Sequence, residues 1–486
     1  MIQSIIHTSE TNNFYLYNDQ FRLSMLIHPE FNKIHEKSMN CDPYYEKKYL
    51  YLKNHGFFSE SKLPNLNTVV NESMVKESIA QTAQIVFEVT DSCNLNCTYC
   101  VLGELYHNTE DRKSRNSRNI KNINIHSAIN LLKYIFELKA YKDPQQLAIS
   151  FYGGEPLLNI KFIKQIVEVV HSLSSEKQMK IGFNMTTNAT LIDKHIDFLI
   201  ANNFNILISL DGNKENNSYR VFRNKNDNSF EKIIDNIDII QRTYPKYFKS
   251  NINFNAVLHN KNSVKDVFEF IYNRYQKIPQ ISELNNINID PTKRDIFENM
   301  FHDARKSEIE YHKEKDNLLR HNEVQPYKEL TDFLKYLSVN SYISNIVSST
   351  YNEDKYFPSS TCLPFQKKIF LTTSKKLLPC ERINSKYSMG KVEGNVVIDI
   401  QEIAKKYSFY YEHLKKVCHH CYMYRFCGVC MFHIEDLNKL DKGERHICDF
   451  FHNQNAFRSK LYRVISLLEK HPNYFFEILE DIVIIA

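Results

Sequence analysis

Three cysteines at positions 93, 97 and 100 are the first residues in this sequence whose type and spacing could carry chemistry. They lie in the segment "DSCNLNCTYC", which directly follows the apolar run "IVFEVT". Three thiolates on one loop can ligate three irons of a [4Fe–4S] cluster and leave the fourth iron open. A closed zinc site would need four ligands. The spacing therefore favours a catalytic iron–sulfur site, and a zinc loop with a borrowed ligand or a set of buried thiols is the alternative.

A second group of seven cysteines lies between positions 362 and 448, with the central segment "CHHCYMYRFCGVC". The chain has 11 cysteines, an odd number that fits a disulfide framework poorly. No apolar run is long enough to cross a membrane, and the N-terminus does not read as a signal peptide. We therefore expect a cytoplasmic protein without a membrane partner, where clustered cysteines usually bind metal. Either zinc sites, joined by His419 or His420, or iron–sulfur clusters would use this group.

Three short polar or glycine-containing segments also stand out, because each ends a predicted strand. They are "FYGGEP" (151–156), "TTNAT" (186–190) and "ISLDG" (208–212), the last of which is followed by Arg220. Each segment alone is weak, since paired glycines or Asp-Gly can simply form a turn. Active sites of α/β barrels lie at the C-terminal ends of the strands. The order of the segments therefore predicts one site built from successive strand ends.

The elements that must position these residues alternate along the chain from residue 85. Strands are predicted at 85–90, 147–152, 180–186, 204–210, 251–258 and, weakly, 287–290, and helices at 126–139, 160–173, 193–202, 230–243 and 264–275. Strands that alternate with helices form parallel, right-handed βαβ units. The predicted fold class is α/β, with a partial (β/α)6 barrel.

The length of 486 residues predicts several domains, and 42% apolar residues suffice for a sizeable core. Residues 1–70 should form a small module, with a hairpin around Asn18-Asp19 and helices at 29–37 and 44–56. The barrel should span 85–292, a helical bridge 293–358, a cysteine-rich domain 359–450 and a helical segment 451–486. The net charge of +5 is weak for this length and does not predict binding to nucleic acid.

The spacing C-x3-C-x2-C, with Tyr99 before the last cysteine, and the three strand-end segments resemble the radical S-adenosylmethionine (SAM) enzyme family over residues 85–290. The resemblance implies that Cys93, Cys97 and Cys100 ligate a catalytic [4Fe–4S] cluster. It implies SAM contacts from Tyr99, Gly153, Gly154, Glu155, Asn188, Ser209 and Arg220. In that family, an electron from the cluster cleaves SAM to a 5′-deoxyadenosyl radical, which abstracts a hydrogen atom from the substrate. No catalytic base is identified, and Asp211, beside a glycine turn, is more commonly structural.

The order of the later cysteines resembles the SPASM extension of radical SAM enzymes. The resemblance implies two auxiliary [4Fe–4S] clusters, so the cofactors would be three [4Fe–4S] clusters and SAM. One auxiliary cluster would be held by Cys418, Cys421, Cys427 and Cys448, and the other by Cys362, Cys380 and Cys430. The second set has three thiolates, so its open iron could bind a substrate thiolate, or a fourth ligand such as Glu381 or Cys41 could complete it.

Enzymes with a SPASM extension mostly act on peptides, and in peptide-maturing relatives a winged-helix-like N-terminal module binds the leader of a ribosomal precursor. Residues 21–27 could offer the edge strand to which such a leader adds, although the module could instead merely cap the barrel. The leading hypothesis is a maturase that installs a thioether or a carbon–carbon or carbon–oxygen cross-link and takes electrons from a flavodoxin or ferredoxin. An anaerobic sulfatase-maturating enzyme, which forms formylglycine, is the alternative. A catalytically silent iron–sulfur scaffold or zinc-bound adaptor is a third possibility.

Overall fold

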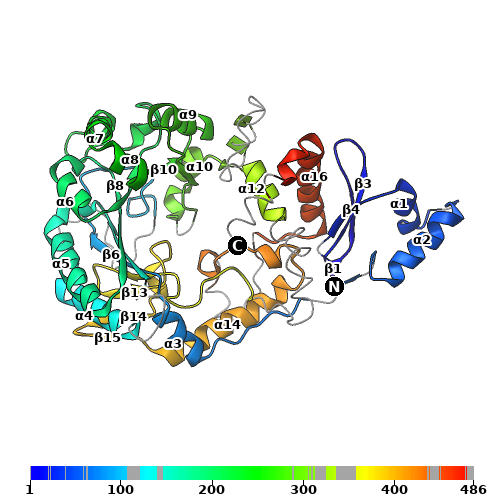
Figure 1. Cartoon of the computed structure of the whole chain (residues 1–486), viewed down its shortest axis with the longest axis horizontal. Coiled ribbons are helices and arrows are strands. Elements are labelled where there is room, and N and C mark those ends of the chain that lie inside the picture. Colours follow the sequence, from blue (N-terminus) through cyan, green and yellow to red (C-terminus); the bar gives the residue numbers. More distant parts are fainter. Residues whose placement is uncertain are drawn as a thin grey trace. The chain divides into compact units, whose positions relative to one another are not determined.

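The structure is a computed structural model that divides into two compact units (Figure 1). It describes residues 2–106 (without 20, 22, 39, 59, 62 and 63), 121–139, 146–286, 289–304, 325–334, 357–434 and 450–476, together with 306, 307, 310, 311, 437, 448 and 478. Unit 1 comprises residues 1–69, 314–361 and 406–486, and unit 2 comprises 70–313 and 362–405. Each unit is considered by itself.

Unit 2 contains a ten-stranded sheet in which six strands follow one another in space as they do in the sequence. These strands are β6 (Gln84–Thr90), β7 (Gln146–Gly153), β8 (Lys180–Thr187), β9 (Asn205–Ser209), β10 (Ile252–Leu258) and β11 (Gln280–Glu283). Each pairs in parallel with the next. Their C-terminal ends therefore lie along one edge of the sheet, as the sequence predicts.

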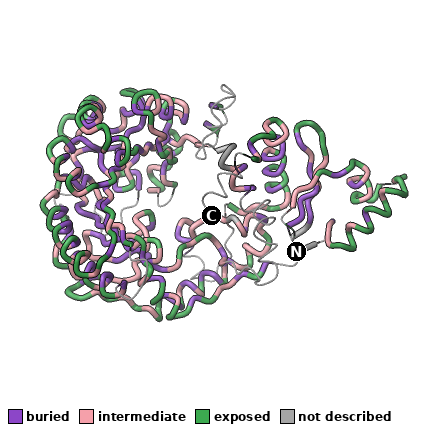
Figure 2. The backbone as a smooth tube through the Cα atoms, in the orientation of Figure 1, coloured by how far each residue is buried: buried purple, intermediate pink, exposed green. Residues whose placement is uncertain are grey.

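Helices connect these strands and form the outer row of unit 2 in Figure 1, with the strands inside. They are α4 (Ile125–Lys139), α5 (Ile160–Lys177), α6 (Ile196–Ala201), α7 (Phe230–Thr243), α8 (Pro245–Asn251) and α9 (Val264–Tyr275), while α3 (Glu72–Ala80) precedes the sheet and α10 (Arg294–Met300) follows it. In α7 the buried residues Ile233, Ile237 and Ile240 recur at three- to four-residue spacing, so one helix face packs inward. Figure 2 shows the strands of this unit as largely buried.

Four short strands extend the sheet beyond β6: β12 (Ile369–Leu371), β13 (Lys376–Leu378), β14 (Gly390–Glu393) and β15 (Asn395–Val397). β12 pairs in parallel with β6, through Ile369 opposite Ile85, and the other three continue antiparallel. The first part of the expected cysteine-rich domain thus belongs to the same sheet as the barrel strands. The helix α14 (Ile400–Cys418) ends at the first cysteine of the central segment.

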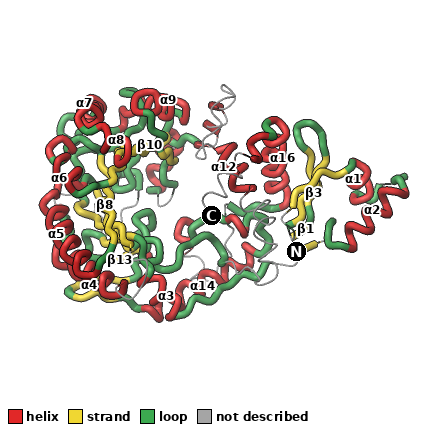
Figure 3. Tube along the Cα trace, in the orientation of Figure 1, coloured by secondary structure: helices red, strands yellow, loops and turns green. Residues whose placement is uncertain are grey.

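Unit 1 contains a three-stranded antiparallel sheet followed by two helices (Figure 3). The strands are β2 (Ile5–Thr8), β3 (Phe14–Asn18) and β4 (Leu23–Ile27), with a short pair of β1 (Ile2–Gln3) and β5 (Glu60–Ser61), and the helices are α1 (Pro29–His35), α2 (Pro43–Asn54), α12 (Gln325–Asp332) and α16 (Gln454–Lys470). Leu16, Phe31, Tyr49 and Phe58 form the core between this sheet and α1 and α2. The hairpin predicted around Asn18-Asp19 is present, whereas β2 was not expected.

The mixed α/β class with a large, mainly parallel sheet is confirmed, but some predicted elements differ. The sixth strand was predicted at 287–290 and lies instead at β11, whose residues are mostly exposed and therefore give little hydrophobic signal. Ile289 forms only an isolated bridge with Tyr106, and positions 287 and 288 lie outside the described residues. Residues 72–80, for which no helix was predicted, form α3. Of the predicted helical bridge at 293–358, α10 and α12 are described and much of the remainder lies outside the described residues.

Candidate active site

The first cysteine loop leaves the C-terminal end of β6 and packs into an apolar cluster. Cys93 and Cys97 are buried and Cys100 is partly buried in this cluster. Burial raises the pKa of the Cys97 thiol to about 12; Arg220 acts in the opposite direction, and the neighbouring thiols Cys100 and Cys93 raise the pKa further. The structure therefore brings the three predicted ligands together.

Two backbone hydrogen bonds fix this loop to the segment that follows Arg220. The amide of Asn96 donates to the carbonyl of Val221 at 2.8 Å, and the amide of Arg223 donates to the carbonyl of Asn94 at 2.9 Å. The conformation of the cysteine loop thus depends on a segment more than a hundred residues later in the chain.

The glycine-rich segment at the end of β7 lies directly against the residue before Cys93. Gly154 donates its amide to the carbonyl of Thr90, and Glu155 donates its amide to the carbonyl of Ser92, both at 2.8 Å. A Cβ atom on Gly154 would lie 1.9 Å from the carbonyl oxygen of Ser92, and Gly153 has a φ of +132°. Glycine is required here because two backbones meet without room for a side chain.

Glu155, predicted as a SAM contact, has a completely buried side chain that is occupied by protein donors. Its carboxylate accepts hydrogen bonds from the hydroxyl of Thr187 (2.7 Å) and the amides of Asn188 (2.8 Å) and Leu157 (3.1 Å). Burial raises the pKa of Glu155 to about 7, although these hydrogen bonds favour the ionised form. The carboxylate therefore holds the 186–190 segment in place.

Asn188 connects that segment to the cysteine loop. Its side-chain nitrogen lies 3.7 Å from the sulfur of Cys93 and donates to the side-chain oxygen of Asn94 at 2.9 Å. The side-chain oxygen of Asn188 accepts from the amide of Thr190 at 3.0 Å. Asn188 is thus fixed on both sides and touches the first cysteine.

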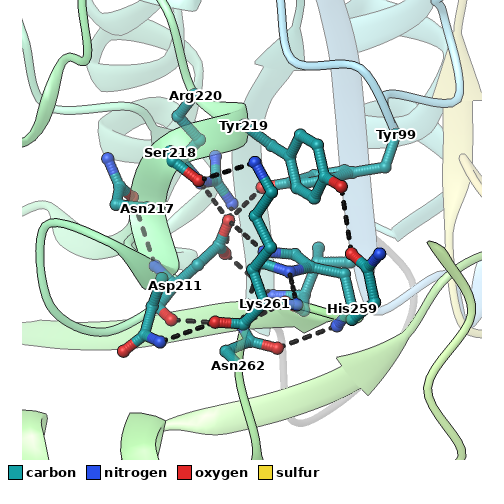
Figure 4. A network of polar contacts seen from close by, with 12 residues as sticks. Tyr99, Asp211, Asn217, Ser218, Tyr219, Arg220, His259, Lys261 and Asn262 are labelled. Carbon is teal, nitrogen blue, oxygen red and sulfur yellow. Dashed lines mark hydrogen bonds and ion pairs between the residues drawn. The ribbon is translucent and has the colours of Figure 1, made fainter.

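Asp211 and Arg220 form a buried, two-pronged ion pair beside the cysteine loop (Figure 4). Nε of Arg220 donates to Oδ2 of Asp211, and Nη2 donates to Oδ1, both at 2.9 Å. The hydroxyl of Tyr99 also donates to Asp211. Two of the three guanidinium nitrogens of Arg220, Nε and Nη2, therefore bind Asp211. Ser209, at the end of β9, donates its hydroxyl to the side chain of Asn255 at 3.1 Å.

Residues after β10, which the sequence did not single out, complete this network. The ring of His259 stacks on the ring of Tyr99 at 5.5 Å, and its Nε2 atom lies 3.7 Å from Asp211. The side-chain nitrogen of Asn262 donates to the backbone oxygen of Asp211 at 3.1 Å. Burial alone would raise the pKa of Asp211, but the charge of Arg220 and the hydrogen bonds from His259 and Arg220 hold it well below its usual range. The segment "HNKN" follows a strand end, which is the signal that could have predicted this contribution.

Four cysteines of the second group lie near one another in unit 1. Burial raises the pKa of Cys418 to about 12, and the neighbouring thiols Cys427, Cys421 and Cys448 contribute to the rise. The amide of His452 donates to the sulfur of Cys421 at 3.5 Å. These four residues are the ones that the sequence assigned to one auxiliary site.

The other predicted set is divided between the units. Cys362, which is exposed, and Cys380 belong to unit 2, and Cys430 belongs to unit 1. The sulfur of Cys380 lies 3.5 Å from the carboxylate of Glu381, one suggested fourth ligand, which also pairs with Lys368 at 2.7 Å.

Cys41, the other suggested ligand, belongs to unit 1, and its sulfur contacts the carbonyl of Ser38. Within the described ranges, no group of three or more His, Cys, Asp or Glu side chains is placed to hold a single metal ion.

The sequence matches the Radical SAM superfamily over residues 87–271. This range contains the first cysteine loop, the hydrogen bonds of Glu155 and Asn188, and the ion pair of Asp211 and Arg220. This chain contains a radical SAM domain. The radical SAM domain accounts for the position of the cysteine loop at the end of β6 and for the polar strand ends around it. Among the parts of the chain that are described, no helix is long and apolar enough to cross a membrane.

Two curated relatives are similar to parts of this chain. The chain is 24% identical over 279 residues (56% of this chain and 54% of the relative) to the radical SAM cyclopropyl synthase TigE of Paramaledivibacter caminithermalis. It is 31% identical over 198 residues (40% of this chain and 48% of the relative) to a cysteine-type anaerobic sulfatase-maturating enzyme of Clostridium novyi. The chain thus spans about half the length of these curated relatives.

A solved structure, native anSMEcpe with bound AdoMet, has a similar fold. It superimposes with a TM-score of 0.51 at 18% identity and covers 82% of this chain and 99% of its own. At this identity the similarity shows the fold alone, and it agrees with the large parallel sheet of unit 2.

Proposed function

We propose that this protein is a radical SAM maturase that modifies a peptide. One observation carries the proposal: three thiols meet at the end of β6, where Asn188 touches Cys93 and the glycine-rich backbone lies against Ser92. The donor set fits a [4Fe–4S] cluster, because Cys93, Cys97 and Cys100 offer three thiolates. When bound, the cluster and SAM supply radical chemistry that starts with reductive cleavage of SAM.

The protein's own residues would position these groups and exclude water. Gly153 and Gly154 would expose backbone atoms to SAM, and Asn188, Ser209 and Arg220 would offer polar contacts. Tyr99 would contribute its ring, since its hydroxyl donates to Asp211. Glu155 would act through Asn188, whose amide it holds at 2.8 Å.

We further infer two auxiliary [4Fe–4S] clusters, one at Cys418, Cys421, Cys427 and Cys448 and one at Cys362, Cys380 and Cys430. The proximity of the first four thiols supports the first site. Three clusters and SAM would then be the cofactors, with a flavodoxin- or ferredoxin-type electron donor. The second site either binds a substrate thiolate or takes a fourth protein ligand.

A peptide substrate is supported by the relatives. One solved structure of anSMEcpe contains AdoMet and a Cp18Cys peptide. The N-terminal module offers β4 at the edge of its sheet, where Leu26 is 64% exposed. We propose that residues 1–70 form a winged-helix-like module that binds the leader of a ribosomal precursor by strand addition, and that the product is a thioether or a carbon–carbon or carbon–oxygen cross-link. The similarity to sulfatase-maturating enzymes keeps formylglycine formation as the second candidate.

The test is an anaerobic reaction of the reconstituted protein with SAM, a strong reductant and a short peptide encoded beside its gene. We expect 5′-deoxyadenosine to be released and the peptide to lose two hydrogens per cross-link, as measured by mass spectrometry. Conversion of a cysteine in a sulfatase-type peptide to formylglycine would instead remove its sulfur and support the second candidate. Cys97→Ala should abolish SAM cleavage, and cleavage at the normal rate in this variant would refute the proposed cluster site.

A further inference from the structure

The turn between β3 and β4 in the N-terminal module places a carboxylate against the segment that connects Cys421 to Cys427. Asp19 lies in this turn, yet its side chain is only 2% exposed. A buried carboxylate must be paired or hydrogen-bonded, because its desolvation is costly. Its partners are the hydroxyl of Tyr17 at 3.3 Å, the hydroxyl of Tyr424 at 3.3 Å and Nη2 of Arg425 at 3.4 Å. Asp19 is therefore bound to residues more than four hundred positions later in the chain.

Two of these partners lie between cysteines that the proposed function assigns to an auxiliary cluster. Tyr424 and Arg425 begin the short 3₁₀ helix Tyr424–Phe426, which connects Cys421 to Cys427. The amide of Tyr424 donates to the carbonyl of Cys421 at 3.3 Å, and the guanidinium of Arg425 lies 4.8 Å from the ring of Tyr424. The carboxylate thus holds two side chains of the segment that sets the separation of two cysteines.

An apolar core joins the same elements. The ring of Tyr17 packs edge-on against Phe457 of α16 at 5.1 Å, and the ring of Tyr422 stacks on Phe457 at 5.4 Å. Cys418 packs against this core. The N-terminal sheet, α16 and the cysteine segment therefore share one packed interior within unit 1.

A second, separate contact holds the module on the far end of α16. Glu469 accepts hydrogen bonds from the side chains of Thr11 (2.6 Å), Asn13 (2.8 Å) and Tyr15 (2.8 Å). It lies near the C-terminus of α16, whereas the cysteine group precedes the N-terminus of this helix. Glu469 anchors the same module without touching the cysteine segment, which makes it a matched control for Asp19.

We propose that Asp19 is a positioning residue for the cluster held by Cys418, Cys421, Cys427 and Cys448, so that the N-terminal module is part of the auxiliary site as well as a peptide-binding candidate. This inference rests on the proposed assignment of a cluster to those four cysteines. Removal of the carboxylate leaves Arg425 without this buried anion and releases the segment between Cys421 and Cys427. The thiols then lose the fixed spacing that a [4Fe–4S] cluster requires.

The experiment uses the full chain with Cys93, Cys97 and Cys100 replaced by alanine, so that only auxiliary clusters contribute iron. In this background we compare Asp19→Ala, Asp19→Asn and Glu469→Gln after anaerobic reconstitution. Asp19→Ala should lose about four irons per chain, the content of one cluster, together with the corresponding electron paramagnetic resonance signal. Asp19→Asn keeps one acceptor oxygen, which can still accept from Tyr424 and Arg425, so it should retain more than half of this signal.

Glu469→Gln should keep full iron content and an unchanged spectrum even if its melting temperature falls as far as that of Asp19→Ala. Full iron and an unchanged spectrum in Asp19→Ala would overturn the inference, as would equal cluster loss in Asp19→Ala and Glu469→Gln. Should Asp19→Ala fail to fold, folded Asp19→Asn with a lowered melting temperature takes its place. A full, unaltered cluster signal in that variant would count against the inference, and a reduced or altered signal would support it. The variant Cys421→Ala separates the two levels: if it loses iron while Asp19→Ala does not, only the inference fails. If Cys421→Ala keeps its iron, the proposed auxiliary site fails as well.

Discussion

Substitution of Gly154, which directly follows β7, by alanine should damage the active site through a steric clash with Ser92. The new Cβ atom would lie 1.9 Å from the carbonyl oxygen and 2.4 Å from the carbonyl carbon of Ser92, whereas real Cβ contacts stay beyond 3.0 Å. The Ser92 backbone must therefore move by about 1 Å. This movement also strains the 2.8 Å hydrogen bond from the amide of Glu155 to Ser92. Overpacking and the weakened hydrogen bond together should cost about 3 kcal/mol of stability.

Ser92 immediately precedes the first cysteine, so its displacement should reach the cluster. A misplacement of about 1 Å in a reacting site can lower a rate by about 100-fold. We expect Gly154→Ala to bind less iron at the catalytic site and to release 5′-deoxyadenosine from SAM about 100-fold more slowly. The control is Gly182→Ala in β8, because no heavy atom lies within 4 Å of that Cβ position. A Gly154→Ala protein with the iron content and rate of the control would refute the steric argument.

Two further predictions concern the buried carboxylates. Asp211→Asn leaves the buried Arg220 without its anion and should destabilise unit 2 by about 3 kcal/mol or more in urea denaturation. Asp238→Asn, which breaks a more exposed pair with Arg274, should cost less than about 1 kcal/mol of stability. Equal costs for the two variants would contradict the buried-pair argument. Burial raises the pKa of Glu155 from 4.5 to about 7, so the fold favours the protonated acid. The contribution of this group to the free energy of unfolding is full below pH 4.5 and is lost as the pH rises through 7. The loss amounts to about 3 kcal/mol in all. The melting temperature of the wild-type protein should therefore fall relative to that of Glu155→Gln between pH 5 and pH 8, and parallel curves for the two proteins would contradict this assignment.

The sequence predicted the part of the site that consists of local patterns. The cysteine loop, the glycine pair and the segment at 186–190 each follow a strand whose apolar pattern is strong, so their meeting at one sheet edge follows from parallel winding. Ranges for five strands and five helices were correct to within a few residues because these elements are long and periodic.

The remaining part of the site depends on contacts between distant residues. His259 and Asn262 follow β10 in a segment with no recognised motif, and only the fold shows that they reach Asp211. Glu155 was predicted to contact SAM, but the sequence gives no indication that three donors of the protein enclose its carboxylate. Likewise β12, with only three residues, joins the sheet through backbone pairing with β6, which local propensity does not encode.

The polar groups around the first cysteine loop form two sets that act on different cysteines. Glu155 and Asn188 hold the loop at Cys93, on the side of β7 and β8. Asp211 and Arg220 hold it through Tyr99, between Cys97 and Cys100, on the side of β9 and β10. Apolar packing could bury the loop but would not fix its direction, whereas hydrogen bonds to fully buried carboxylates do so because each misaligned donor is costly. Loss of either carboxylate should therefore impair cluster binding at a lower temperature than the one at which unit 2 unfolds.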